Sequence, residues 1–155
     1  NFKNSINPGT NSFREFPKNF EKLKLKKNKK IAMYCTGGIR CEKASVYLKS
    51  KGYKNVYQLD GGILNYIDYK HNSNEISNWQ GECFVFDQRV AVNRMLKKGK
   101  YLQCYGCRRP ILKIDTKSNK YEKGVCCHQC YDERSDFQKE KSKMRQKQLK
   151  IKEVN

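Results

Sequence analysis

The sequence predicts an α/β fold built on a parallel sheet, and two observations indicate it. Two short apolar runs, residues 31–35 and 55–59, have the length and the flanking turns of buried strands. Between them, residues 41–48 carry apolar or small side chains at the i, i+3, i+4, i+7 spacing of one helix face. A strand, a helix and a second strand in this order form a βαβ unit, whose two strands are parallel neighbours.

Other elements flank this unit. Residues 1–20 combine turn formers with scattered aromatic residues, which predicts an ordered loop with a short helix. A second short helix is expected over residues 63–69, and a third apolar stretch covers residues 79–87. A basic helix begins after Ser135, where Gln138 three residues later completes a capping box. This last helix has little apolar periodicity, so we expect it to be solvated or to lie on RNA.

The charge of the chain is large and unevenly distributed. Its 155 residues carry 34 Lys and Arg against 15 Asp and Glu, a formal net charge of +19. Residues 1–30 hold nine basic and two acidic side chains, residues 94–155 hold eighteen and seven, and residues 31–93 hold seven and six. Such a distribution indicates a polyanionic partner, most often nucleic acid. The alternative is a Lys- and Asn-rich proteome in which the surface lysines serve no partner.

The cysteines indicate a reducing compartment. Four of the eight form two C-x-x-C pairs and a fifth ends a predicted strand, a pattern that favours metal binding and thiol chemistry over a secreted disulfide scaffold. No stretch approaches the ~20 apolar residues that span a bilayer, and no secretory signal is visible in a chain that starts at Asn1. We expect the cytoplasm or an organellar matrix, without secretion and without a membrane partner.

Cys35 is the predicted catalytic residue. A thiol reacts as its thiolate, so its site must lower its pKa. Cys35 ends the first predicted strand, glycines in the next turn let backbone N–H groups converge, and the following helix N-terminus and Arg40 add positive charge. The turn therefore predicts an anion or persulfide cradle; the alternative is a buried cysteine before an ordinary loop. The cradle residues are Thr36, Gly37, Gly38, Ile39 and Arg40.

Cys41, six residues after Cys35, has two interpretations. It can act as a resolving thiol, because a disulfide or persulfide relay needs a second sulfur nearby. It can equally be a small buried residue on the helix face. Cys83, within an apolar stretch, is expected in the core, and the aromatic residues Trp79, Phe84 and Phe86 are expected to serve packing and not to contact a cofactor.

Two cysteine pairs predict a zinc site. Cys104-x-x-Cys107 and Cys127-x-x-Cys130 are separated by nineteen residues, the arrangement of two knuckles that bind one tetrahedral ion. Four protein ligands leave no open position, so the metal would be structural. Two disulfides or free thiols are the alternatives, and Cys126 and His128 can substitute for a ligand of the second knuckle.

The basic residues around and after this module are predicted RNA contacts. Arginines can bind phosphates while neighbouring tyrosines stack on bases. The alternative role of these side chains is to solubilise the surface of a small metal module. The predicted contacts are Arg108, Arg109, Lys139, Lys141, Lys143, Arg145 and Lys147.

Several motifs resemble a known family. Residues 35–40, CTGGIR, resemble the active-site loop of rhodanese-like domains, and residues 60–63, DGGI, with Tyr66 resemble the segment that follows the next rhodanese strand. Over nearly the whole chain, five ordered motifs are similar to the rhodanese-related tRNA uridine hydroxylases (the TrhO type). The motifs are MYCTGGIRCEKAS, YQLDGGIL, WQGECFVFDQRVAV, CYGCRRP and CYDERSDFQK.

The resemblance implies an activity and a fold. The activity is hydroxylation of the wobble uridine of tRNA to 5-hydroxyuridine, with molecular oxygen as co-substrate and Cys35 required. The fold is a rhodanese-like parallel sheet without its first strand, since the match starts near Phe2, partway through the domain. We expect either a longer protein or a shortened domain. The resulting domains are a partial rhodanese-like domain (1–93), a cysteine-rich zinc-binding module (94–132) and a basic helical tail (133–155).

Two other functions remain open at the level of sequence. One is a structural RNA-binding subunit of a ribonucleoprotein, such as an organellar ribosome with rRNA as partner, which the high charge and the missing strand favour and the intact Cys35 loop does not. The other is a thiosulfate or persulfide sulfurtransferase, which explains Cys35 but gives no role to the flanking charge or to the zinc module.

Overall fold

The computed structural model describes residues 1–154, and side chains up to residue 149. The chain divides into two compact units, which we describe separately. Unit 1 comprises residues 1–83 and 92–97, and unit 2 comprises residues 84–91 and the described chain from residue 98 onward. None of the helices in the described part of the chain is both long and apolar enough to cross a membrane.

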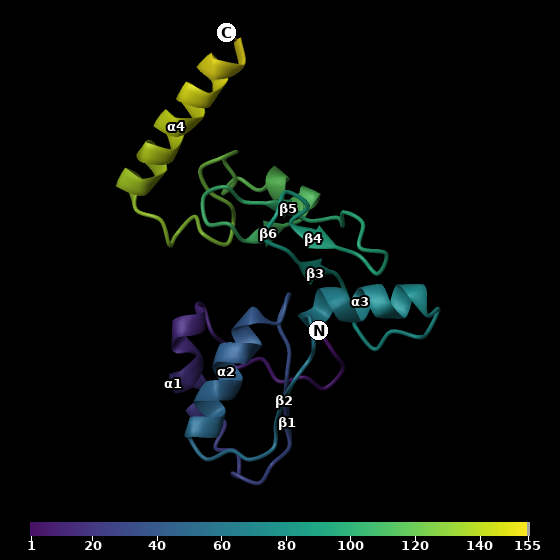
Figure 1. Ribbon diagram of the computed structural model, residues 1–155. Helices are drawn as coiled ribbons and strands as arrows, with labels where there is room; N and C mark the ends of the chain where they lie inside the picture. Colours follow the sequence, from purple (N-terminus) through teal and green to yellow (C-terminus); the bar gives the residue numbers. More distant parts are fainter. Residues whose placement is uncertain (155) are drawn as a thin grey trace. The chain divides into compact units, whose positions relative to one another are not determined.

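Unit 1 contains the predicted βαβ arrangement (Figure 1). Strand β1 (Ile31–Met33) pairs in parallel with β2 (Val56–Gln58), with Ile31 opposite Val56. Helix α2 (Ile39–Ser50) connects them, and helix α3 (Gly62–Asn72) follows β2. The prediction of two parallel neighbouring strands joined by a helix is therefore confirmed.

Helix α2 begins two residues earlier than its apolar spacing predicts. Gly38 precedes it with φ of +88°, a conformation open to glycine but costly for other residues, and this turns the chain directly into the helix. At the other end, Gly52 has φ of +84° and ends the helix as expected. The buried face of α2 comprises Cys41, Ala44 and Leu48.

The short helices at the N-terminus depend on aromatic packing. The 3₁₀ helix η1 (Phe13–Glu15) runs into α1 (Phe16–Glu21), which is too short to be stable in isolation. Phe20 of α1 is buried in the core of unit 1 with Ile31, Leu48 and Tyr53. The expected short helix within residues 1–20 is present, and its aromatic face attaches it to α2 and β1.

Unit 2 is built from very short elements around cysteine side chains. Strands β5 (Leu102–Gln103) and β6 (Pro110–Ile111) are antiparallel and precede the 3₁₀ helix η2 (Lys113–Lys117). Elsewhere, β3 (Cys83–Phe84) lies in a two-stranded sheet with β4 (Ala91–Val92). The core of unit 2 comprises Cys104, Ile111, Val125, Cys126, Cys127 and Cys130.

The basic helix α4 (Asp136–Val154) begins at the predicted capping box. The backbone N–H of Gln138 donates to Oγ of Ser135 at 3.3 Å, and the N–H of Ser135 donates to the Gln138 side chain at 3.2 Å. The sequence predicts a solvated or RNA-lying helix, but one side of α4 is packed against other parts of unit 2. Ser142 is 7% exposed, and Arg134 bridges its hydroxyl (2.8 Å) and the carbonyl of Gly106 (2.7 Å). One side of α4 is thus attached to the cysteine-rich part of unit 2.

Candidate functional site

Cys35 lies just beyond the end of β1 and is half-buried. Burial alone would raise the pKa of its thiol, but backbone N–H groups of Cys41, Arg40 and Gly38 and the thiol of Cys41 donate hydrogen bonds to the sulfur. Their combined effect outweighs burial, so the pKa of Cys35 lies below its ordinary value of 9.0. The surroundings of Cys35 at the start of α2 therefore favour the thiolate form of its side chain.

The pKa of the neighbouring Cys41 thiol is shifted in the opposite direction, upward. It is 4% exposed, and burial together with the charge of Cys35 and the hydrogen bond between the thiols raises its pKa to about 12. At neutral pH the Cys41 thiol stays protonated and donates a hydrogen bond to the Cys35 sulfur. The two sulfurs thus form an asymmetric pair, one poised to react and the other to supply a proton or a second thiol.

The predicted cradle residues contribute in different ways. Arg40 bonds through a guanidinium nitrogen to Oγ1 of Thr36 at 3.3 Å, which fastens its side chain across the loop. Its charge lowers the pKa of Cys41, while its backbone N–H acts on Cys35. Ile39 contributes no side chain to the cradle interior: it is 69% exposed beside the loop. Gly38 supplies both an N–H donor and the sharp turn.

The segment at the start of α3 is hydrogen-bonded to the Cys35 loop. The N–H groups of Ile63 and Leu64, at the start of α3, donate to the carbonyl oxygens of Cys35 (2.9 Å) and Thr36 (3.1 Å). Gly62 lies at this junction with φ of +68°, and a Cβ there would stand 2.5 Å from the Cys35 oxygen and 2.6 Å from the Gly38 nitrogen. Only glycine allows this approach. We call these contacts the loop clamp.

Sequence reasoning missed two residues of this site. It gave Gly62 no role of its own, although the paired glycines of the DGGI segment were the available signal. It placed Cys83 in the core, which is correct because this residue is 3% exposed. However, Cys83 also bonds the Thr36 side chain and lies near enough to Cys35 for their charges to interact. No local sequence pattern predicts the approach of Cys83 to Thr36 and Cys35.

The four predicted metal ligands converge in unit 2. The sulfurs of Cys104, Cys107, Cys127 and Cys130 all lie within 4.8 Å of one another. Individual separations of 3.9 to 4.0 Å match the ~3.8 Å edge of a tetrahedron with ~2.3 Å metal–sulfur bonds. These four thiols could hold a metal ion such as zinc.

The close approach of the two knuckles depends on a glycine. A Cβ on Gly106, in the first knuckle, would lie 2.1 Å from the carbonyl oxygen of Val125 beside the second. The two substitute ligands do not join the cluster. The thiol of Cys126 faces the Lys120 carbonyl at 3.6 Å, and His128 is exposed with Nδ1 4.0 Å from Asp115.

The predicted RNA contacts fall into two groups. Four of them have partners within unit 2. Arg109 pairs with Glu133 at 2.8 Å. Lys143 lies between Glu122 and Glu140, and Arg145 donates to the carbonyl oxygens of Tyr105 and Gly124. Lys139 lies over the ring of Tyr131 and near Asp136. Arg108, Lys141 and Lys147 are exposed and form no ion pair with any residue that the structure describes. RNA contact by these residues stays a prediction.

Comparison with known proteins bears on the site as a whole. Residues 2–68 match the model of the rhodanese-like domain, which includes the Cys35 loop and the loop clamp. Over 150 residues the chain is 57% identical to a tRNA uridine(34) hydroxylase of Pelagibacter ubique (strain HTCC1062). That similarity covers 97% of this chain and 48% of the relative, so the chain spans about half the length of the protein it matches. The resemblance to rhodanese-related tRNA uridine hydroxylases is confirmed.

The loop clamp predicts the effect of Gly62→Ala. The added methyl group would collide with the Cys35 carbonyl and displace the Gly38 N–H from the sulfur. We expect the pKa of Cys35 to rise toward its ordinary value of 9.0. The pH dependence of iodoacetamide alkylation at Cys35, followed by peptide mass spectrometry, measures this shift.

Gly52→Ala is the matched control. Gly52 also has a positive φ, +84°, but a Cβ there meets no atom within 4 Å, so the variant carries the backbone strain without the collision. Its Cys35 alkylation profile should equal that of the wild type. Identical profiles for all three proteins would contradict the role of the clamp.

Proposed function

The chain carries a rhodanese-like domain and is related to a tRNA uridine(34) hydroxylase, and from that premise we propose that it forms 5-hydroxyuridine at the wobble position of tRNA. The intact cradle around Cys35 carries the proposal. Three backbone N–H groups and one thiol act on its sulfur and hold its pKa below the ordinary value. A chain that used this fold only to bind RNA would have no need for a thiol tuned in this way.

We assign the chemistry to residues 1–93, metal binding to residues 94–132 and further RNA binding to residues 133–155. Molecular oxygen is the proposed co-substrate, as the family resemblance implies. The +19 net charge supports tRNA as the partner, because a surplus of cations attracts the phosphate backbone. Among the seven predicted RNA contacts, Arg108, Lys141 and Lys147 are the strongest phosphate-binding candidates, since the other four have partners within unit 2. The free cysteine thiols fit a reducing compartment.

Cys41 is the proposed resolving thiol. Once Cys35 is oxidised to a sulfenic acid, its negative charge no longer raises the pKa of Cys41. The Cys41 thiol then loses its proton, its sulfur attacks Cys35, and the Cys35–Cys41 disulfide forms with release of water. If Cys35 carries a persulfide, the same attack releases hydrogen sulfide. The hydrogen bond between the two thiols supports this role, because it holds the second sulfur beside the first.

A structural zinc ion is the proposed occupant of the four-cysteine cluster. Four thiolates at tetrahedral separations suit zinc and leave no position for water. The surrounding strands are two residues long and the core consists largely of the cysteines themselves. Metal binding would therefore supply much of the stability of this part of the chain.

The other two functions are less well supported. A ribonucleoprotein subunit needs no reactive thiol, whereas the Cys35 loop has a depressed thiol pKa. A sulfurtransferase that acts on small thiols needs only the rhodanese-like domain. The similarity to the hydroxylase, by contrast, extends over 97% of the chain and thus through the cysteine cluster.

Cys35→Ser should abolish product formation. The hydroxyl of serine stays protonated, so the cradle would hold no nucleophilic anion. In cells that lack the endogenous activity, we expect the 5-hydroxyuridine content of tRNA to fall by ~100-fold or more relative to the wild type, as measured by nucleoside mass spectrometry. The variant should still bind tRNA with an affinity within about twofold of the wild type. Product at the wild-type level would refute the assignment of Cys35.

Cys41→Ser should separate a resolving thiol from a packing residue. After one equivalent of peroxide, the wild type should contain the Cys35–Cys41 disulfide, because the second thiol displaces water from the sulfenic acid. The variant should instead hold a dimedone-reactive sulfenic acid at Cys35, read by peptide mass spectrometry. Cys83→Ser is the control, and it should still form the disulfide. A disulfide between Cys35 and Cys83 in the wild type would exclude Cys41 from this role.

Metal analysis should find one zinc per chain. Cys107→Ser should reduce the zinc content to background and lower the melting temperature of unit 2, since the remaining sulfurs cannot complete the tetrahedron. Cys126→Ala, which removes a neighbouring thiol outside the cluster, should retain the zinc. Two disulfides in the purified chain, detected by mass spectrometry before and after reduction, would argue for the alternative pairing.

A further inference from the structure

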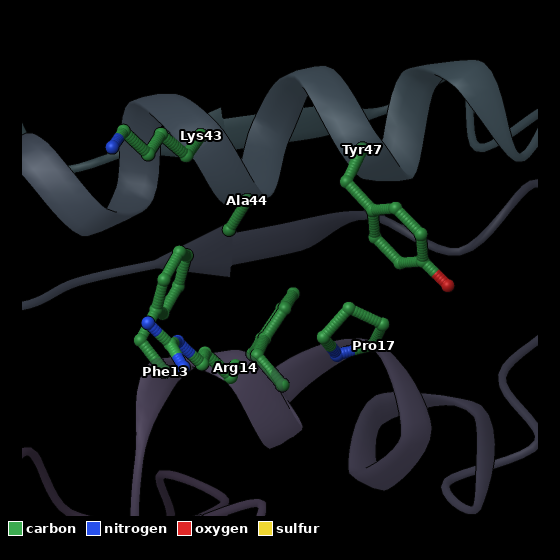
Figure 2. Close-up of a pocket in the computed structure, with 7 residues that line it drawn as sticks. Phe13, Arg14, Pro17, Lys43, Ala44 and Tyr47 are labelled. Carbon is green, nitrogen blue, oxygen red and sulfur yellow. The ribbon is translucent and has the colours of Figure 1, made fainter.

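A groove in unit 1 lies between the N-terminal helices and α2. Figure 2 shows Phe13, Arg14 and Pro17 on one side, facing Ala44 and Tyr47 on the other. Phe16 and Lys43 complete the lining, and the groove encloses about 220 Å³. This lies below the ~300 Å³ at which ordinary small-molecule sites begin. The space therefore suits one planar ring better than a large ligand.

The groove continues the helix face that begins at the active-site loop. Residues three, four and seven positions apart share one side of an α-helix, so Lys43, Ala44 and Tyr47 lie on the same face as Arg40. Lys43 is about 5 Å of helical rise from Arg40. Arg40 in turn bonds Thr36 in the Cys35 loop. A ligand that extends from the Cys35 loop along α2 would reach this groove next.

The lining combines aromatic surface with cations. The ring of Phe13 stacks on that of Phe16 with centroids 5.8 Å apart, and Phe16 meets Tyr47 edge-on at 6.5 Å. Phe13 is 36% exposed, so part of its ring remains open to a ligand. Neither Arg14 nor Lys43 forms an ion pair with any residue that the structure describes.

One carboxylate lies at the far end of this surface. Glu21 accepts a hydrogen bond from the Tyr47 hydroxyl at 2.8 Å, and Lys51 pairs with it at 3.8 Å. The Glu21 carboxylate is therefore already bound by Tyr47 and Lys51. The groove is left with aromatic walls and two cations, the combination that binds an unpaired base together with its phosphate.

We propose that this groove binds the nucleotide next to the target uridine of a single-stranded RNA loop. The base stacks on Phe13, and the adjoining phosphates contact Arg14 and Lys43. This inference rests on the proposed function, because it assumes that the uridine is presented at Cys35. It adds a site for the neighbouring base that positions the substrate along α2.

The test uses an anticodon stem-loop labelled for fluorescence anisotropy and the purified chain with its variants. Arg14→Gln combined with Lys43→Gln should raise the Kd about tenfold at low salt and lower the slope of log Kd against log salt by ~1.4, for two lost phosphate contacts. Phe13→Leu keeps an apolar side chain but removes the ring, and it should raise the Kd ~5-fold or more. Phe13→Tyr should restore the wild-type affinity.

Lys18→Gln combined with Lys49→Gln is the matched control. It removes the same net charge from α1 and α2 at exposed positions outside the groove, and should change the Kd less than twofold. A stem-loop with 4-thiouridine beside the wobble uridine should crosslink to the lining residues of the wild type on irradiation.

The outcomes separate the two proposals. Equal affinities for the groove variant and the control variant, or a crosslink that maps only outside the groove, would overturn the groove assignment and leave the proposed function standing. A wild-type chain that does not bind the stem-loop at any salt concentration would overturn both.

Discussion

The hydrogen bonds from the start of α3 to the carbonyl oxygens of Cys35 and Thr36 are the contacts on which the rest of unit 1 depends. They hold those carbonyls toward α3 and away from the Cys35 sulfur, which the N–H groups of Gly38, Arg40 and Cys41 face. A carbonyl turned the other way would meet the thiolate with like charge. The pKa of Cys35 is therefore a property of two loops, joined where Gly62 has no side chain.

Both units consist of short elements, and each contains a cluster of thiols. In unit 1, the strands β1 and β2 are three residues long, and a pair of thiols lies at the start of the connecting helix. In unit 2, the strands are shorter still, and four thiols stand at the separations of a tetrahedral metal site. Elements this short cannot be stable by backbone hydrogen bonding alone. Aromatic and aliphatic packing compensates for their length in unit 1, and the cysteine-rich core does so in unit 2.

Some basic residues of the chain stabilise the protein and others form no ion pair with the residues that the structure describes, and the sequence alone does not tell the two groups apart. Some build the protein: Arg134 and Arg145 bond carbonyl oxygens of the cysteine-rich segment and attach α4 to it. Others, among them Arg14, Lys43 and Lys147, have no ion-pair partner in the described part of the chain. The second group is the more available to phosphates, because its N–H donors and its charge are not already engaged by protein groups.

The sequence by itself determined the features that depend on neighbours along the chain. The βαβ unit, the Cys35 turn, the Ser135 capping box and the spacing of the cysteine pairs all follow from residues a few positions apart. Only the tertiary structure decided the features that depend on which surfaces meet. Gly62 reaches Cys35 from 27 positions away, Cys83 reaches Thr36 from 47, and Arg145 reaches Tyr105 from 40. Local periodicity carries no information about such encounters, because the packing of whole elements sets which side chains face one another.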